Sequence, residues 1–173
     1  KAIGLEISNQ NGDILAGGTW SNIQAIKNLL QGKDAEVALS AADALRSLQE
    51  PSAVSLLSNM LASGDAGKIE AAKQALMSFS GKINNDVAKV IPSATKEGQI
   101  AGIELLANRK ASEKLGTILE LLKSSDKDVQ SAAYASLKDI ASAQDRTKMC
   151  GLLEEAPKDM IGDLQQAVIA TLR

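Results

Sequence analysis

Few side chains in this sequence could carry out acid–base or nucleophilic chemistry. The chain contains no histidine, so no imidazole can act as a general base, a metal ligand or part of a catalytic triad. The single cysteine, Cys150, excludes an internal disulfide. Cys150 follows Leu57 and Leu119 in the repeating pattern described below, which predicts a small buried core residue rather than a reactive thiol.

The carboxylates and glycines also lack the spacing of known motifs. Glu154 and Glu155 are adjacent and diverge on a helix, which indicates solvated charge. Asp126 and Asp128 follow two serines, but the stretch lacks the glycine and the terminal glutamate of a calcium-binding loop, and helix capping explains Asp126 better. No glycine-rich phosphate loop is present. The sequence therefore predicts no enzyme, no catalytic residue, no cofactor and no metal site.

Any functional residue must be positioned by the helices, and the helical pattern is clearest in residues 34–61. Asp34 is a good N-cap because its carboxylate can accept from the free amides of the first helical turn. An apolar stripe at helical spacing then runs from Val37 to Leu48. Pro51 begins a second helix, where its missing N–H costs nothing. The segment predicts two helices joined by a tight corner.

This unit repeats along the chain. One apolar position recurs at a constant step of 31 residues, at Leu29, Met60, Ile91, Leu122 and Leu153. A second recurs with one residue missing in the third unit, at Leu45, Leu76, Leu106, Leu137 and Val168. The units are expected over residues 21–48, 51–80, 84–108, 112–141 and 144–172. Such a period predicts an all-α helical solenoid.

Length, composition and charge agree with that fold. The 173 residues suffice for one domain, and aromatic residues make up only 2 %, so alanine and leucine must fill the core. No apolar run reaches the length of a membrane span. A net charge of −2 with few arginines argues against a nucleic-acid partner. The first residue is Lys1 rather than methionine, which is compatible with a processed or excised fragment of a soluble protein and leaves its compartment open.

Residues 1–20 do not fit the repeat. Alternating apolar and polar residues followed by an Asn-Gly turn signal are typical of a short hairpin, and an extended segment fits equally well. We therefore expect a non-repeat lead segment over 1–20 and a solenoid over 21–173.

The unit at residues 34–57 resembles a HEAT-like repeat. The matching residues are Asp34, Val37, Ala41, Ala42, Ala44, Leu45, Leu48, Pro51, Ala53, Val54 and Leu57. More narrowly, the unit is similar to the short bacterial form, of about thirty residues, of the phycobilisome-lyase HEAT-like repeat family. The unit at Asp126 matches well, and the third and fifth units are degenerate. Ala38 and Gln130 stand where that family often carries an arginine.

The resemblance implies a right-handed, armadillo-like α-α superhelix of about five antiparallel helix pairs. Proteins with this repeat usually act as protein-interaction scaffolds, and some attach bilins to phycobiliproteins. The resemblance also implies that the second helix of each pair lines the concave side. That side is therefore the expected partner-binding surface.

Helical geometry then selects the exposed strip. Leu39, Asp43 and Arg46 lie roughly opposite the core residues of their helix at 100° per residue. The candidate partner-binding residues are Leu39, Asp43, Arg46, Glu70, Gln74, Met77, Glu104, Tyr134 and Lys138. Ile100 belongs to the same strip, and the file of Ala42, Ile103 and Tyr134 runs beside it.

Tyr134 is the best single anchor of this strip, since tyrosine is enriched at binding hot spots. Exposed apolar residues bordered by acids favour a protein or peptide groove. In the alternative interpretation, Ile100 and Ile103 face inward because the third unit is out of register.

We expect a non-catalytic scaffold for protein–protein or peptide interaction. One alternative is a subunit of a chromophore lyase or other enzyme complex of the phycobilisome-lyase type, which the missing histidines and arginines disfavour. A less favoured alternative is a HEAT-like nucleic-acid-binding protein. Ile169 and Leu172 end the fifth unit without a polar cap, which favours end-to-end packing on another domain, a removed segment or a second copy.

Overall fold

The computed structural model describes residues 20–30, 32, 34–49 and 51–172. These residues form α-helices and short 3-10 helices without a strand, which confirms an all-α fold. The α-helices are α1 (Trp20–Leu30), α2 (Ala35–Leu48), α3 (Pro51–Leu61), α4 (Ala66–Met77), α5 (Asn84–Val90), α6 (Lys96–Asn108), α7 (Leu115–Leu121), α8 (Lys127–Ile140), α9 (Arg146–Glu155) and α10 (Ile161–Ala170). The 3-10 helices are η1 (Ile91–Ser93), η2 (Ser112–Lys114), η3 (Ala143–Asp145) and η4 (Lys158–Met160). The lead segment expected over residues 1–20 lies outside the described residues except for Trp20, which begins α1.

Aspartates begin several helices, as their sequence positions predict. The Asp34 carboxylate accepts from two amides in the first turn of α2, including Val37 N at 3.3 Å. Asp65 accepts from Lys68 N at 3.1 Å, and Asp126 accepts from Val129 N at 3.2 Å. Each carboxylate thus satisfies a donor that the helix leaves free and lies at the positive end of the helix dipole.

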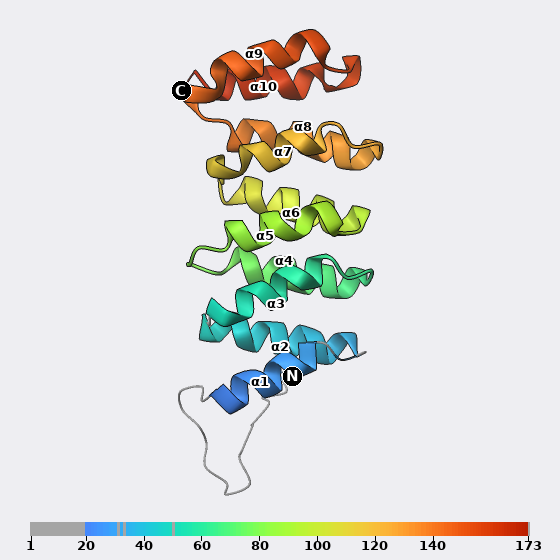
Figure 1. Cartoon of the computed structure of the whole chain (residues 1–173), viewed down its shortest axis with the longest axis vertical. Coiled ribbons are helices and arrows are strands. Elements are labelled where there is room, and N and C mark those ends of the chain that lie inside the picture. The colour runs from blue at the N-terminus through green and yellow to red at the C-terminus, as the bar shows by residue number, and fades with distance from the viewer. Residues whose placement is uncertain (1–19, 31, 33, 50, 173) are drawn as a thin grey trace, which may run out of the picture.

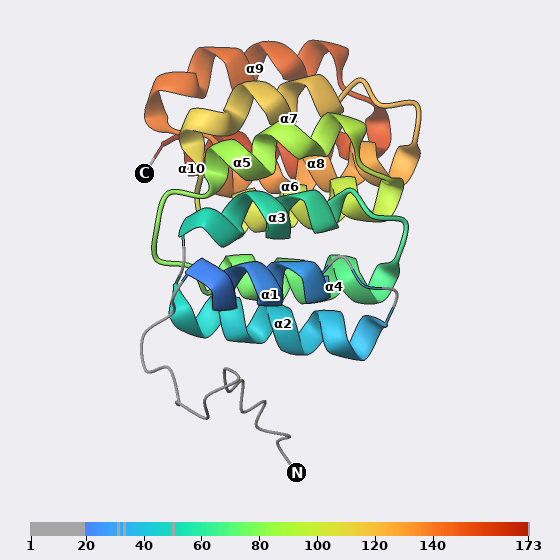
Figure 2. The ribbon, with the colours of Figure 1, turned by 60° about the horizontal axis from the view of Figure 1, so that its bottom comes forward.

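The helices form two layers along the long axis of the molecule (Figure 1). Each odd-numbered helix contacts the even-numbered helix that follows it. We call α2, α4, α6, α8 and α10 the even layer; each of these helices also contacts the next one in the layer. The odd layer comprises α1, α3, α5, α7 and α9, and within the described chain only α3 and α5 contact each other extensively. Figure 2 shows the odd helices in front of the even ones.

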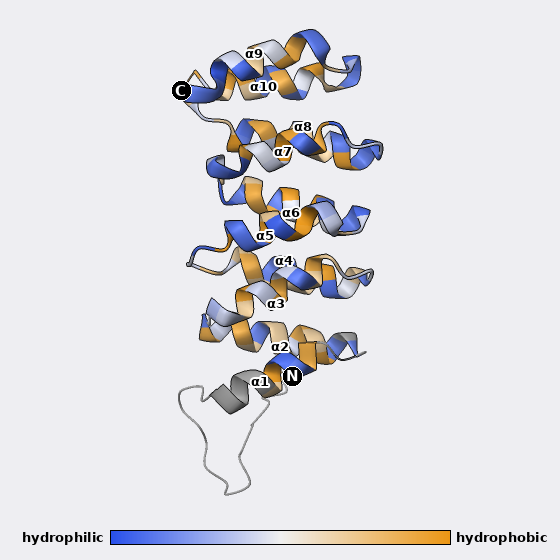
Figure 3. Ribbon diagram, viewed as in Figure 1, coloured by the Kyte–Doolittle hydropathy of each residue, from blue (hydrophilic) through white to orange (hydrophobic). Residues whose placement is uncertain are grey.

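The core lies between the layers and follows the repeat. Apolar residues recur along the helices, as the ribbon colours of Figure 3 show, and the buried apolar residues form one cluster. The repeated leucines Leu45, Leu76, Leu106 and Leu137 are fully buried. Val168, in the same position, is only partly buried, because no described helix covers α10 from beyond.

The predicted stripe of α2 is wrong at both ends. Val37 is only partly buried, whereas its neighbour Ala38 is fully buried. Leu48, expected in the core, is 47 % exposed. The core-facing arc of α2 is centred on Ala38, Ala41 and Leu45, since these residues face α1 and α4, which pack on α2.

Two glycines let α6 approach its neighbours closely in the unit that lacks one residue. A Cβ at Gly98 would lie 1.9 Å from the carbonyl oxygen of Leu61, at the end of α3. A Cβ at Gly102 would lie 2.5 Å from Cγ1 of Ile91. Both positions therefore require glycine for packing rather than for backbone conformation.

The loop after α4 is held from both sides by side chains of the neighbouring units. Gln49 donates to Ser78 O at 3.2 Å and accepts from Ser80 N at 2.9 Å. Arg109 donates to Phe79 O at 2.7 Å and to Gly81 O at 2.8 Å. These bonds satisfy backbone groups that neither α4 nor α5 can pair, and they join three successive units.

Candidate binding surfaces

The structure brings most of the predicted strip to the outer face of the even layer. We call this set the even face: Leu39, Asp43, Arg46, Glu70, Gln74, Met77, Glu104 and Lys138. Leu39 and Met77 are each 44 % exposed, so two large apolar side chains of this face are in contact with solvent. Ile169, in the same file on α10, is 46 % exposed.

Polar partners within the even face compensate much of its charge. Arg46 Nε donates to Asp43 Oδ1 at 3.2 Å, one turn away on α2. Gln74 donates to Glu70 Oε1 at 2.9 Å on α4. Lys73 forms an ion pair with Glu104 that joins α4 to α6. The even face therefore presents a mixed surface with no excess of basic groups.

Two shallow hollows lie on the even face on either side of α6. The first, of about 260 Å³, separates α4 from α6 and is lined by Glu70, Lys73, Ile100 and Glu104 among others. The second, also of about 260 Å³, separates α6 from α8 and includes Ala107 and Lys138. Side chains of a bound partner could enter both hollows, which share Glu104 at their common border.

Tyr134 is not an exposed anchor. It is 5 % exposed, and Ile103, one repeat earlier, is fully buried. Ala42 in the same file is 1 % exposed, and Ile100 packs partly buried against the core. The prediction of an exposed position is therefore wrong for Ala42, Ile103 and Tyr134. The inward interpretation holds for Ile103, whereas Ile100 is partly buried and lines the first hollow. The reason is that this file faces the next unit, which covers it.

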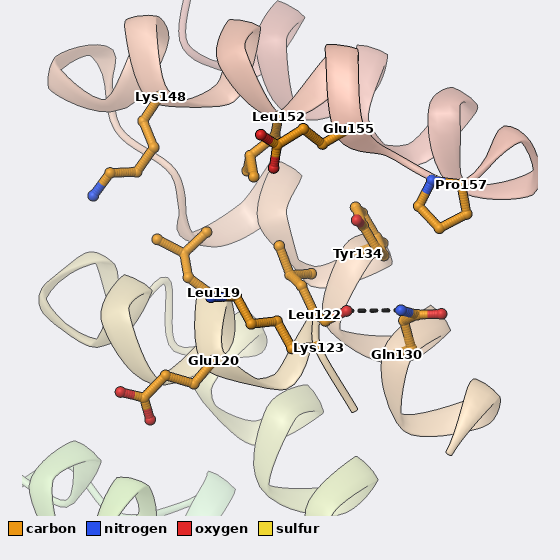
Figure 4. A pocket seen from close by; sticks show the side chains of 10 residues that line it. All are labelled: Leu119, Glu120, Leu122, Lys123, Gln130, Tyr134, Lys148, Leu152, Glu155 and Pro157. Atoms are coloured by element: carbon orange, nitrogen blue, oxygen red, sulfur yellow. Dashed lines mark hydrogen bonds between the residues drawn. The ribbon is translucent and has the colours of Figure 1, made fainter. Parts of the chain in front are cut away.

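Tyr134 instead lies at the floor of a groove in the odd layer (Figure 4). The groove has a volume of about 520 Å³ and opens between α7 and α9, which make no extensive contact with each other. Its lining residues are Leu119, Glu120, Leu122, Lys123, Gln130, Tyr134, Lys148, Leu152, Glu155 and Pro157. Sequence reasoning missed this site, because only the spacing of neighbouring units opens it.

The polar groups of the groove are largely available to a ligand. Gln130 donates to Leu122 O at 2.7 Å, which fixes its amide. Within the described residues, the Tyr134 hydroxyl forms no hydrogen bond, and Lys123 and Lys148 form no ion pair. Burial, and secondarily the charge of Glu155, raise the pKa of the Tyr134 phenol. The groove thus combines an apolar floor with unpaired charges and one unpaired hydroxyl.

Cys150 is exposed, so the prediction of a buried thiol is wrong. In α5, α7 and α9 the residue that packs in the core is the one just before the position that the repeat pattern predicts. Val87, Ile118 and Met149 are fully buried there, whereas Leu57 fills that place in α3. The signal was present in the sequence, because Val87, Ile118 and Met149 also recur every 31 residues.

The described residues contain no group of three or more acidic, cysteine or histidine side chains arranged to hold a metal ion. No helix in the same part of the chain has both the length and the apolar character that crossing a bilayer requires.

No family model matches the chain, and no curated protein matches it. Among solved structures, the chain is similar to the crystal structure of an engineered protein from the Northeast Structural Genomics Consortium. The TM-score is 0.52 at 22 % sequence identity, and the match covers 90 % of this chain and 85 % of that chain. A likeness at this identity concerns the fold alone.

Proposed function

We propose that this chain is a non-catalytic scaffold that binds a protein or peptide partner through the even face. The single observation that carries the proposal is the exposure of Leu39 and Met77 on that face. Exposed apolar side chains of this size on a face with mixed polar groups are typical of protein-interaction surfaces.

We also propose the architecture that this function needs, a right-handed HEAT-like superhelix of five antiparallel helix pairs. The short corners between consecutive helices and the 31-residue step support it. The even helices contact one another more extensively than the odd helices do, which supports the even face as the concave side. The proposed relation to the short phycobilisome-lyase type of repeat is supported by the residue pattern around Asp34 and Asp126.

We propose that the partner is a protein and not a nucleic acid. Two basic side chains of the even layer, Arg46 and Lys73, are paired with Asp43 and Glu104. A phosphate backbone needs several uncompensated cations, and the pairing removes two of them.

The test is a matched pair of substitutions on one helix. Leu39→Lys places a charge on the even face, and Leu48→Lys places the same charge on the opposite side of α2. The two leucines are similarly exposed, at 44 % and 47 %, so both variants should fold alike. The native chain and both variants are used as bait, and the retained proteins are quantified by mass spectrometry.

We expect a partner that is retained by the native chain and by Leu48→Lys and is lost with Leu39→Lys. Equal retention by all three baits would contradict the even face as the binding surface. Tyr134→Ala is unsuitable here, because removing a buried aromatic ring costs about 3–5 kcal/mol and would disturb the fold.

A further inference from the structure

We propose that the groove above Tyr134 binds an extended peptide segment of a partner protein, in which two apolar residues are flanked by an acidic and a basic residue. The groove belongs to the odd layer, so this proposal does not depend on the even face. Its lining comes from α7 and the turn that follows it, from α8 and α9, and from Pro157 after α9 (Figure 4).

The first argument is the Tyr134 hydroxyl. The side chain is 5 % exposed, yet its hydroxyl has no hydrogen-bond partner in the described part of the chain. The hydroxyl oxygen is not among the fully buried unpaired oxygens of the described residues, so it is open to the groove and can donate to an acceptor that a ligand supplies in place of water. A peptide carbonyl is such an acceptor, and an extended segment presents one at each residue.

The second argument is the shape and polarity of the groove. Leu119, Leu122 and Leu152 give it apolar walls around the tyrosine ring. Its volume of about 520 Å³ lies within the range of sites that enclose small ligands or a few side chains. Two aliphatic side chains of a peptide would replace water against these leucines.

The third argument is the distribution of charge along α9. Lys148 and Glu155 are two helical turns apart, which corresponds to about 10 Å along the axis. An extended chain covers that distance in about three residues. An acidic residue beside Lys148 and a basic residue beside Glu155 therefore enclose two residues. On the opposite wall, Glu120 of α7 and Lys123 of the turn after α7 add one charge of each sign. The unpaired state of these lysines in the described chain leaves them available to the peptide.

The experiment is a titration of the chain with the N-acetylated, C-amidated tetrapeptide Asp-Leu-Leu-Lys, followed by NMR. Tyr134 is the only tyrosine, so a tyrosine-labelled sample gives a single ring signal, and leucine methyl labels report on the walls. We expect saturable shifts of the Tyr134 ring. The peptides Ser-Leu-Leu-Ser and Asp-Ser-Ser-Lys test the charged and apolar parts separately, and each should bind more weakly.

Variants then separate the groove from the rest of the molecule. Tyr134→Phe removes only the unpaired hydroxyl and keeps the ring, so the fold is preserved and peptide binding weakens. Lys148→Glu should weaken the Asp-Leu-Leu-Lys peptide by up to about fivefold, as for exposed ion pairs. Leu48→Lys, which places a charge on α2 outside both binding surfaces, should leave the titration unchanged.

Three results would overturn the proposal. The first is equal affinity of the native chain, Tyr134→Phe and Lys148→Glu for the charged peptide. The second is the absence of any saturable shift. The third is a shift of the Tyr134 ring on concentrating the chain without peptide, because it would assign the groove to a second copy.

Discussion

At the scale of single residues, Tyr134 is both a structural and a spectroscopic feature. It is the only tyrosine of the chain, and its phenol is buried at the floor of the groove with Glu155 nearby. Desolvation disfavours the phenolate, and the carboxylate of Glu155 disfavours it further. One side chain therefore reports on the state of the whole groove.

The first prediction concerns the ionisation of this phenol. Absorbance near 295 nm should give a midpoint above the ordinary tyrosine pKa of about 10 in the folded chain, and near 10 in denaturant. Because the folded pKa is raised, its contribution to stability is complete below pH of about 10 and is lost as the pH rises through the folded pKa. Glu155→Gln should lower the folded midpoint only in part, since burial is the larger cause. A folded midpoint at or below that of the denatured chain would contradict the burial.

The second prediction concerns Ser58 in α3. Its side chain is 1 % exposed, and within the described residues its hydroxyl oxygen has no hydrogen-bond partner. Ser58→Ala removes the unsatisfied group with little change in volume, so we expect a gain of about 1 kcal/mol in the free energy of unfolding. Thermal melts should show a rise of about 2–4 °C in Tm. A loss of stability would indicate that the hydroxyl is satisfied in solution.

At the scale of elements, the fit of α6 against α3 depends on the absence of a side chain at Gly98. The carbonyl of Leu61 occupies the space that a Cβ would need, and a backbone atom cannot move aside as a flexible side chain can. This contact explains how a unit with one residue fewer still stacks in line with the others.

The third prediction tests that contact with a matched glycine. Gly98→Ala should lower the free energy of unfolding by about 3 kcal/mol through overpacking. Gly116→Ala, in α7, meets no atom within 4 Å and should be neutral or raise stability by up to about 1 kcal/mol through helix propensity. Urea denaturation of both variants measures the difference. Similar stabilities for the two variants would show that α6 is not seated on α3.

The sequence predicts where the helices begin and end better than it predicts which face of each helix is buried. The N-caps Asp34, Asp65 and Asp126 are local features, and the structure confirms them. Cys150 and Tyr134 were placed wrongly, because which face of a helix is covered depends on the neighbouring unit. If each odd helix from α5 onward turns about its own axis by the angle of one residue, Met149 instead of Cys150 lies in the core. The groove depends on the separation of α7 and α9, which no local pattern encodes.

At the scale of the whole molecule, α10 packs on α8 and α9, and no other described helix covers its far side. Ile169 is 46 % exposed and Leu172 is 61 % exposed, and Val168, next to Ile169, is only partly buried. In a repeat array the last unit presents the face that a further unit would cover. Ile169 and Leu172 therefore give the end of the described stack an exposed apolar surface.

The fourth prediction follows from this open end. The native chain should show sedimentation coefficients that rise with concentration, because a head-to-tail contact between copies would cover Ile169 and Leu172. The double variant Ile169→Lys, Leu172→Lys should sediment as one species at all concentrations. Leu48→Lys serves as the control for adding a charge elsewhere. If the native chain itself sediments independently of concentration, a second copy does not cover this end.

The unequal contacts of the two layers give the molecule a mechanical character. The even layer is continuous, whereas α7 and α9 are held together mainly through α8 and α10. Tension applied to the two ends would therefore extend the odd layer more easily than the even layer, and the opening between α7 and α9 is one of the places that would widen. A peptide bound between α7 and α9 would resist that widening, so tension and peptide binding would oppose each other.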